Sequence, residues 1–345
     1  MRRRSRLALS ILSLAVVAGL ATGCSGLKQS SSSEETSGAA ASSAASDVDV
    51  PSLEGKTVGV AAKDVVRDFG RLTYQGVQDR LEELGAKVVA TQADAQDDKH
   101  LANVENLVSQ KVDAIVVILG DATTLAPALQ QAKDADIPVF TIDHASENSV
   151  NNIGSDNWQI GSTLARTLAE DIGGKGKVLV FNGFYDVTPC QIRYDEFKLV
   201  LKNYPGIEII EPELQDVYEG TIEDAKQKTN DALTRYPKGE ISAVWSCWDL
   251  PAIGASQAID AAGRDEIKVY GVDAEPGALD LIADPDSVYQ FTVAQQPTLF
   301  GTTSANNVAL YLGGKQDEVP LSTYLDAVFI DKANVADERK RLGLE

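Results

Sequence analysis

The sequence predicts an α/β fold with two doubly wound parallel-sheet domains and a ligand cleft between them. From Thr57 onward, short apolar and β-branched runs alternate with amphipathic helical stripes, which is typical of parallel sheets covered by helices. The same alternation restarts after Asn157. At 345 residues and 43% hydrophobic content, the chain is long enough for two domains of this class.

The first domain is expected at residues 55–156 plus 296–325. It opens with a strand over Thr57–Ala62 and a helix over Arg71–Gly85, whose apolar residues recur every three or four positions. Further strands are predicted at 87–91, 114–119 and 137–142, with helices at 97–110 and 123–134.

The second domain is expected at residues 157–295 plus 326–345. A helix at 157–172 precedes strands at 178–182, 208–210, 242–246, 268–272 and 288–294, and helices are predicted at 192–203, 222–236 and 251–262. A helix at 299–312 and a short strand at 327–330 remain after these two similar halves. The chain is therefore expected to cross between the domains more than once, through a multi-strand hinge.

The first 24 residues predict a bacterial export signal. Four arginines precede the apolar run Leu7–Ala21, whose 15 residues fall short of the roughly 20 that span a bilayer. Gly23 directly before Cys24 resembles the lipobox of bacterial lipoproteins. That resemblance implies a lipidated Cys24 at the outer side of the cell membrane. Ordinary secretory cleavage, with Cys24 incidental, is the alternative.

Residues 25–54 are rich in Ser and Ala and predict a flexible tether, because they offer almost nothing to bury. Removal of residues 1–24 takes away four arginines and no acid, which changes the formal charge from -20 to -24. So acidic a surface repels nucleic acid, which we exclude as a partner.

The motifs favour a binding protein over an enzyme. The sequence contains no phosphate-binding G-x-x-x-x-G-K-[ST], no G-x-S-x-G and no H-E-x-x-H, and we expect no cofactor and no metal site. Two histidines, His100 and His144, are too few for a histidine-rich metal site or a conventional catalytic triad. A cell-surface enzyme that uses His144 as a base is the least favoured alternative, since no nucleophile is apparent.

Two predicted strands end in the same way. The segment IPVFTIDHA runs into Asp143 and His144, and the strand Lys268–Val272 runs into Asp273. Each aspartate alone could simply cap a turn or a helix. Two at matching strand ends favour a ligand site, because α/β sheets bind ligands beyond the carboxyl ends of their strands.

Cys190 and Cys247 are an even pair in an exported chain, which favours a disulfide. In a doubly wound sheet of the usual order, the first and third strands of the second domain are neighbours, so the loops after Asn182 and Ser246 should adjoin. Two buried free thiols are the alternative.

The segments QIRYDEF, VWSCWD and FTVAQQP contain further residues of a known pattern, which are Arg193, Trp248, Asp249 and Gln295. With Asp143 and Asp273, they make residues 55–331 resemble the ribose/galactose-type periplasmic binding proteins, the substrate receptors of bacterial ABC sugar importers. The resemblance implies two Rossmann-like domains joined by three hinge strands, which close on a monosaccharide.

The same resemblance implies roles for single residues. Asp143, Asp249, Asp273 and Gln295 would accept or share hydrogen bonds with hydroxyls, and Arg193 would donate to a hydroxyl or ring oxygen. His144 replaces the usual Arg, and Trp248 occupies a position where the family usually has Asn. Phe69 is the candidate aromatic residue of the first loop, Lys63–Gly70.

Three aspartates against one arginine imply a small neutral sugar or polyol, because a phosphate would be repelled. The expected protein is a monomeric, extracytoplasmic receptor that delivers its ligand to an ABC permease and is held at the membrane by a lipid anchor. A sensory receptor of the same fold, which presents its liganded form to a membrane kinase or chemoreceptor, is the alternative.

Overall fold

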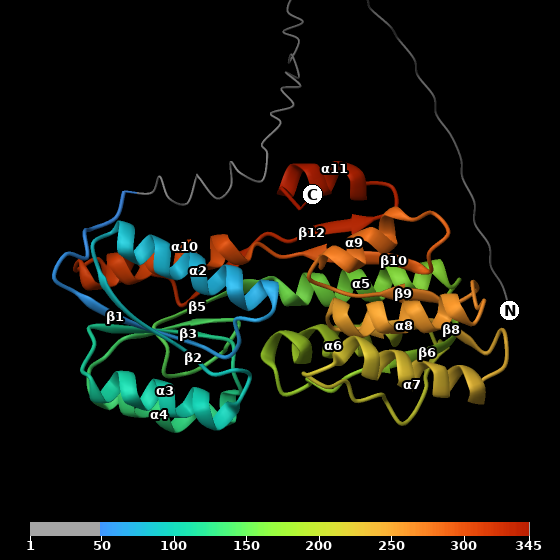
Figure 1. Cartoon of the computed structure of the whole chain (residues 1–345), viewed down its shortest axis with the longest axis horizontal. Coiled ribbons are helices and arrows are strands. Elements are labelled where there is room, and N and C mark those ends of the chain that lie inside the picture. The colour runs from blue at the N-terminus through green and yellow to red at the C-terminus, as the bar shows by residue number, and fades with distance from the viewer. Residues whose placement is uncertain (1–48, 345) are drawn as a thin grey trace, which may run out of the picture. The chain divides into compact units, whose positions relative to one another are not determined.

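The computed structural model describes residues 49–344, which form two lobes, each built on one six-stranded sheet (Figure 1). The predicted α/β fold with two parallel-sheet domains is confirmed. The first sheet is parallel throughout and has the strand order β11 (Ser322–Leu325), β5 (Asn151–Ser155), β4 (Val139–Ile142), β3 (Ala114–Ile118), β1 (Thr57–Ala62), β2 (Lys87–Gln92).

The second sheet repeats this arrangement with one exception. Its strand order is β12 (Val328–Asp331), β10 (Tyr289–Ala294), β9 (Lys268–Tyr270), β8 (Ile241–Ser246), β6 (Lys175–Phe181), β7 (Gly206–Ile209). Only β12 at the edge runs antiparallel to its neighbour β10 among these described strands. The expected adjacency of the first and third strands of this domain is present, because β6 pairs with β8.

A pair of helices covers each face of the first sheet. One pair is α2 (Asp68–Glu83) with α10 (Pro297–Leu312), and the other is α3 (Asp97–Ser109) with α4 (Ala122–Asp134). Gly76 lets α10 approach α2 closely, because a Cβ there would lie 2.7 Å from the Thr298 carbonyl oxygen. This contact holds α10 on the first lobe although its sequence follows the strands of the second.

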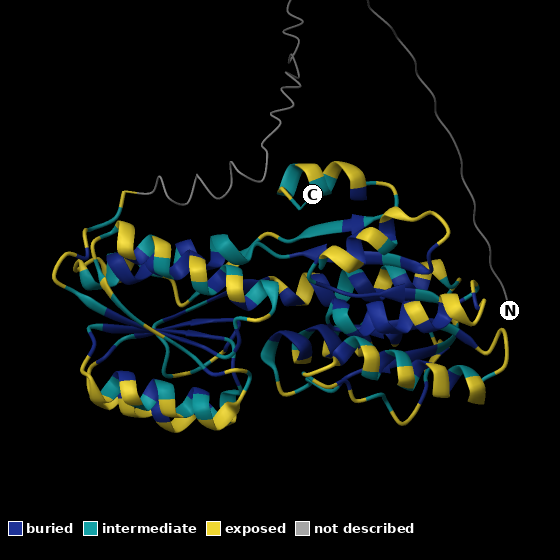
Figure 2. Cartoon of the chain, in the orientation of Figure 1, coloured by how far each residue is buried: buried dark blue, intermediate teal, exposed yellow. Residues whose placement is uncertain are grey.

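The second sheet is covered in the same way, by α5 (Asn157–Asp171) with α6 (Thr188–Leu201) and by α7 (Thr221–Arg235) with α8 (Asp249–Ala261). Figure 2 shows the strands largely buried and the outer faces of the helices exposed. Central strands such as β3, AIVVI, are buried at every position, which explains their unbroken apolar sequence. The elements α9 (Pro276–Ala283), α11 (Val335–Leu342) and the short 3₁₀ helix η1 (Gln316–Glu318) complete the described chain.

The chain crosses between the lobes three times, after β5, after β10 and between β11 and β12. The sequence predicts the last crossing only through the short strand at 327–330 and predicts no strand at β5 or β11. Within residues 49–344, no helix is both long enough and apolar enough to cross a bilayer. The predicted export signal and Cys24 lie outside the described residues.

Candidate functional site

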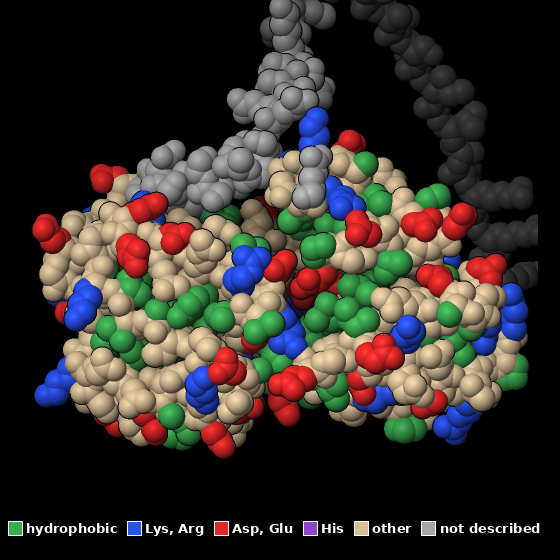
Figure 3. Space-filling model, in the orientation of Figure 1, with side chains coloured by type: hydrophobic (Ala, Val, Ile, Leu, Met, Phe, Trp, Pro, Cys, Tyr) green, Lys and Arg blue, Asp and Glu red, His purple; other side chains and the backbone are tan. Residues whose placement is uncertain are grey.

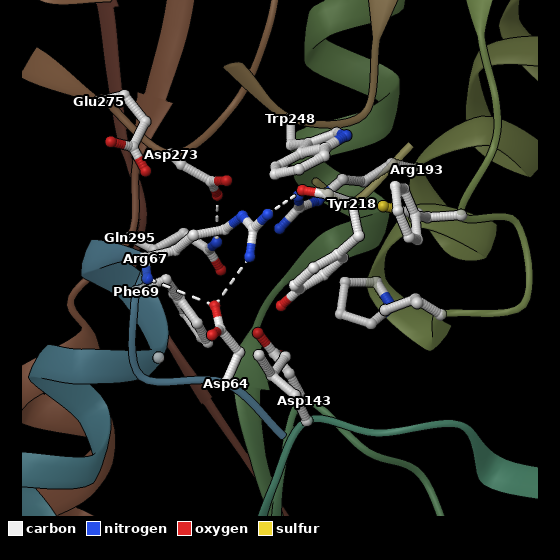
Figure 4. A pocket seen from close by; sticks show the side chains of 16 residues that line it. Asp64, Arg67, Phe69, Asp143, Arg193, Tyr218, Trp248, Asp273, Glu275 and Gln295 are labelled. Atoms are coloured by element: carbon white, nitrogen blue, oxygen red, sulfur yellow. Dashed lines mark hydrogen bonds and ion pairs between the residues drawn. The ribbon is translucent and has the colours of Figure 1, made fainter. Parts of the chain in front are cut away.

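A cavity lies between the carboxyl ends of the two sheets, with walls from both lobes (Figure 4). In Figure 3, basic and acidic side chains gather where the lobes adjoin. The first lobe contributes Asp64, Arg67, Phe69, Gly70, Leu119 and Asp143. The second contributes Phe184, Val187, Pro189, Cys190, Arg193, Tyr218, Trp248, Asp273, Glu275 and Gln295. Six of the eight predicted ligand-binding residues therefore line one cavity.

Asp143 follows β4 and turns its side chain into this cavity. Its backbone has φ 49°, a left-handed conformation that Asp tolerates better than most residues. Gly154 leaves room for it, since a Cβ there would lie 2.7 Å from Asp143 Oδ1. No donor within residues 49–344 is hydrogen-bonded to the carboxylate. Burial raises the pKa of Asp143 to about 7, and the charge of Arg193 opposes that rise.

Asp273 occupies the matching place after β9 and also has a positive φ, of 122°. Gln295 Nε2 donates to Asp273 Oδ1 at 2.7 Å, and Ser155 Oγ donates to Gln295 Oε1 at 3.0 Å. These two bonds fix which end of the Gln295 amide is donor and which is acceptor. Burial raises the pKa of Asp273 to about 7, and Arg193 again opposes the rise.

Arg193 reaches the cavity from α6 and is only 2% exposed, so it is not a charge on the outer surface of that helix. Nε donates to Asn157 Oδ1 at 2.8 Å, and Nη1 donates to the Cys247 carbonyl oxygen at 2.8 Å. Nη2 is buried without a protein partner in the described chain. Burial lowers the pKa of Arg193, while the charges of Asp273 and Asp143 oppose that change.

Trp248 is part of an aromatic wall of the cavity and also packs against the core of the second lobe. Its ring lies near-parallel to that of Tyr218, with centroids 6.3 Å apart, and edge-to-face with Phe184 at 5.5 Å. Trp248 Nε1 donates to Asp216 Oδ2 at 2.5 Å, so its one polar atom already has a partner. The ring therefore offers an apolar face to a ligand. Phe69, in the first turn of α2, packs edge-to-face on Phe300.

Asp249 does not line the cavity, although the sequence predicts a ligand contact there. It is fully buried and accepts hydrogen bonds from the Tyr289 hydroxyl at 2.6 Å, the Thr292 hydroxyl at 2.8 Å and the Glu275 backbone N–H at 2.9 Å. Trp248 is extended, and consecutive side chains of an extended chain point in opposite directions. With Trp248 facing the cavity, Asp249 faces the sheet and fixes the loop that carries Asp273.

His144 is also outside the cavity lining. It is fully buried, and its Nδ1 lies 3.2 Å from the Gly120 carbonyl oxygen, in hydrogen-bonding distance. Burial lowers its pKa, which favours the neutral ring. It is therefore a core side chain here and does not take the place of the family arginine in the cavity.

Five polar or aromatic lining residues were not predicted from the sequence: Asp64, Arg67, Phe184, Tyr218 and Glu275. Asp64 and Arg67 lie in the same first loop as Phe69. The place of this loop directly after the first strand is the feature of the sequence that indicates a cleft there. Nothing in the sequence around Tyr218 distinguishes it from an ordinary surface loop between β7 and α7.

The predicted disulfide between Cys190 and Cys247 is present, with the two Cα atoms 5.3 Å apart. It joins the start of α6 to the loop after β8. Because Cys247 also accepts the Arg193 hydrogen bond and precedes Trp248, the bridge fixes two cavity residues at once.

The profile of a family described as periplasmic binding protein domain matches residues 58–316. The ribose import binding protein of Bacillus subtilis is 28% identical over 273 residues, which cover 78% of this chain and 86% of that protein.

Two solved structures are more similar. An ABC transporter solute-binding protein from Agrobacterium vitis with bound allitol is 46% identical, has a TM-score of 0.81, and is matched over 83% of this chain and 98% of its own. An ABC sugar transporter subunit from Rhodobacter sphaeroides is 45% identical, with a TM-score of 0.80 and coverage of 82% and 100%. Profile, sequence and structure agree, and the chain belongs to the periplasmic binding protein domain family, whose members bind solutes and are not enzymes.

Proposed function

We propose that this chain is the extracytoplasmic solute-binding component of an ABC importer and that its ligand is a small neutral polyol or monosaccharide. One observation carries the proposal: the cavity contains both an unpaired hydrogen-bond acceptor and an unpaired hydrogen-bond donor. The Asp143 carboxylate accepts no hydrogen bond from the described chain, and Arg193 Nη2 is a buried donor without a partner. Buried polar groups are normally satisfied, so these groups favour a ligand with several hydroxyls.

The rest of the lining supports a neutral ligand with both polar and apolar surfaces. Asp143, Asp273 and Glu275 outnumber Arg193, and Arg67 is already paired with Asp64 at 2.9 Å. A bound anion would face this excess of carboxylates. The Trp248 ring can cover the C–H face of a carbon chain or sugar ring, as aromatic side chains do at amphipathic ligands.

The similar proteins narrow the ligand class. The 46% identical structure holds allitol, an open-chain polyol, and more distant relatives are named for ribose. An open-chain polyol presents hydroxyls along its length, which matches acceptors contributed by two separate sheets. We therefore rank polyols before cyclic sugars for this chain.

The two lobes would close on this ligand from opposite sides. The first lobe comprises residues 55–156 plus 296–325, and the second comprises residues 157–295 plus 326–345. Closure brings Asp143 of one lobe toward Arg193 and Asp273 of the other. A permease that binds the closed form would then receive the ligand at the membrane.

Anchoring through Cys24 is part of the proposal. The arginine cluster, the short apolar run and Gly23 support lipidation of Cys24. The test is metabolic labelling with a fatty-acid analogue and membrane fractionation of wild type and Cys24→Ser. We expect label and membrane association only in the wild type; equal processing and membrane association of the variant would refute the anchor.

Calorimetric titration with allitol and then with ribose tests the ligand class. We expect saturable binding of at least one of them at one site per chain, and loss of affinity in Asp143→Ala. Asp317→Ala, in the exposed helix η1, is the matched control and should bind like the wild type. If neither polyols nor monosaccharides bind, or if Asp143→Ala binds unchanged, this cavity is not the sugar or polyol site.

A further inference from the structure

Arg67 reaches across the cleft from the first lobe to the second (Figure 4). Nη1 donates to Asp64 Oδ2 at 2.9 Å within its own lobe, and Nη2 donates to the backbone carbonyl oxygen of Tyr218 in the other lobe. The guanidinium carbon lies 3.6 Å from the centroid of the Tyr218 ring. The contact therefore combines a charged hydrogen bond with a cation–π interaction.

Both ends of this contact are held in place. Asp64 is 2% exposed and also accepts the backbone N–H groups of Val66 and Arg67, at 3.1 and 3.3 Å. On the other side, the Tyr218 ring packs on Trp248, and its carbonyl oxygen also accepts from Thr221 Oγ1 at 2.9 Å. A side chain fixed in one lobe thus meets a partner fixed in the other.

The position of this contact is unusual within the described chain. Among the hydrogen bonds of residues 49–344, the other side-chain links between the lobes join Ser155 to Gln295, Gln296 to Asp326 and Gln159 to Asp156, all beside the crossing segments. Arg67 to Tyr218 is the link that spans the cavity itself. A bond there can form only when the lobes are closed, whereas a bond at the hinge tolerates opening.

We infer that Arg67 and Tyr218 form a clamp that stabilises the closed form and so sets ligand affinity without selecting the ligand. This inference rests on the proposed function. When only the closed form binds, the apparent Kd equals the Kd of the closed form divided by the fraction of molecules that are closed. Loss of the clamp lowers that fraction, so every ligand should weaken by the same factor.

A direct ligand contact by Arg67 is the competing explanation. Its two Nη groups already donate to Asp64 and to the Tyr218 carbonyl oxygen, and its guanidinium face packs on the Tyr218 ring. Nε is buried without a partner among the described residues. If Nε binds a particular hydroxyl, the effect of removing Arg67 will depend on which polyol is bound.

The test is calorimetry of Arg67→Met with two polyols, allitol and xylitol. We expect both Kd values to rise by the same factor, about tenfold, from the loss of one charged hydrogen bond and one cation–π contact. Arg71→Met is the matched control, because Arg71 pairs with Asp68 on the exposed side of α2 and lies within one lobe. Its affinities should equal those of the wild type. Different factors for the two polyols, or no change in Arg67→Met, would overturn the clamp.

A second measurement does not depend on ligand. Spin labels on the outer helices of each lobe report the distance between lobes in the ligand-free protein, and Arg67→Met should shift the distribution toward longer distances. Tyr218→Leu should shift it in the same direction, and the double variant should change it by less than the two single effects combined. An unchanged distribution in both single variants would overturn the clamp.

The two measurements also separate the clamp from the proposed function. If the wild type binds neither polyol, the ligand class is wrong, while the distance measurement still decides the clamp. If Arg67→Met does not fold, as judged by circular dichroism, Arg67→Lys replaces it. Lys keeps the charge but has no planar fork to reach both partners, so it should still open the lobes and weaken both polyols equally.

Discussion

Two parts of the site differ in how completely their polar groups are satisfied: the second wall, meaning the second-lobe residues that line the cavity or lie directly behind it, and Asp143 on the first wall. In the second lobe, Arg193 donates to Asn157 and Cys247, Trp248 donates to Asp216, and Asp249 accepts three donors. In the first lobe, Asp143 lies at a strained backbone position and accepts no hydrogen bond within the described chain. Apart from Arg193 Nη2, these groups of the second wall are therefore paired before the ligand arrives, whereas the Asp143 carboxylate on the first wall has no partner in the described chain and is left for the ligand.

This difference predicts that polar residues near the cavity separate into two groups. Removal of a satisfied group on the second wall should lower the stability of the protein, because it leaves buried partners unpaired. Removal of the unpaired group on the first wall should lower ligand affinity and leave stability intact. The following predictions test that separation.

The largest effect is expected for Asp249→Ala. The substitution leaves the hydroxyls of Tyr289 and Thr292 and the Glu275 N–H without a partner, and it opens space in the core. We expect a loss of about 3 kcal/mol or more in the free energy of unfolding, measured by urea denaturation without ligand. Gln257→Ala, at an exposed position of the same helix α8, is the control and should change it little. Equal stability of Asp249→Ala and wild type would show that this network is not structural.

Loss of the disulfide should come next. The Cys190→Ser, Cys247→Ser double variant should lose roughly 2–4 kcal/mol in the free energy of unfolding, because a cross-link restricts the unfolded chain. Ligand affinity should fall as well, since the bridge fixes the loops of Arg193 and Trp248. Denaturation and calorimetry with and without reductant measure both effects; reduced wild type should behave like the variant. Free thiols in unreduced, exported protein would contradict the bridge.

Asp143→Ala should show the opposite pattern. We expect affinity for a bound polyol to fall by about tenfold or more, because the hydroxyl partner of a buried carboxylate is lost. The free energy of unfolding should stay equal or rise, because the variant no longer buries an unpaired carboxyl group. If Asp143→Ala destabilises the ligand-free protein as Asp249→Ala does, the two walls do not differ in the way described.

The residues that sequence reasoning located well are those whose position follows from strand ends. Asp143 and Asp273 end buried apolar strands, so the rule for α/β sheets places them at the cleft. The disulfide follows from the same strand order. Asp249 and His144 could not be placed in this way, because a one-residue step along an extended chain turns a side chain to the opposite face.

The elements that the sequence does not predict depend on distant contacts. Strand β5, NNIGS, is polar and lacks the usual β-branched run. Its Asn151 is nevertheless buried, because Nδ2 donates to the Pro320 carbonyl oxygen and Oδ1 accepts from Asn307 Nδ2. The pairing of β5 with β11 and the contact of Arg67 with Tyr218 each join segments that are far apart in the sequence. Local sequence patterns therefore do not predict them.

The smallest effect expected is a pH dependence of ligand affinity near neutrality. Burial raises the pKa of Asp143 and of Asp273 to about 7 in the ligand-free protein. A hydroxyl that donates to a carboxylate favours the ionised form, so binding lowers these pKa values. Affinity is then complete well above pH 7 and is lost as the pH falls through that value, by about twofold per carboxylate between pH 8 and pH 7. In Asp143→Asn, whose side chain does not titrate, calorimetry from pH 6 to pH 8.5 should give a shallower dependence. A dependence as steep as that of the wild type would mean that Asp143 does not meet the ligand as a carboxylate.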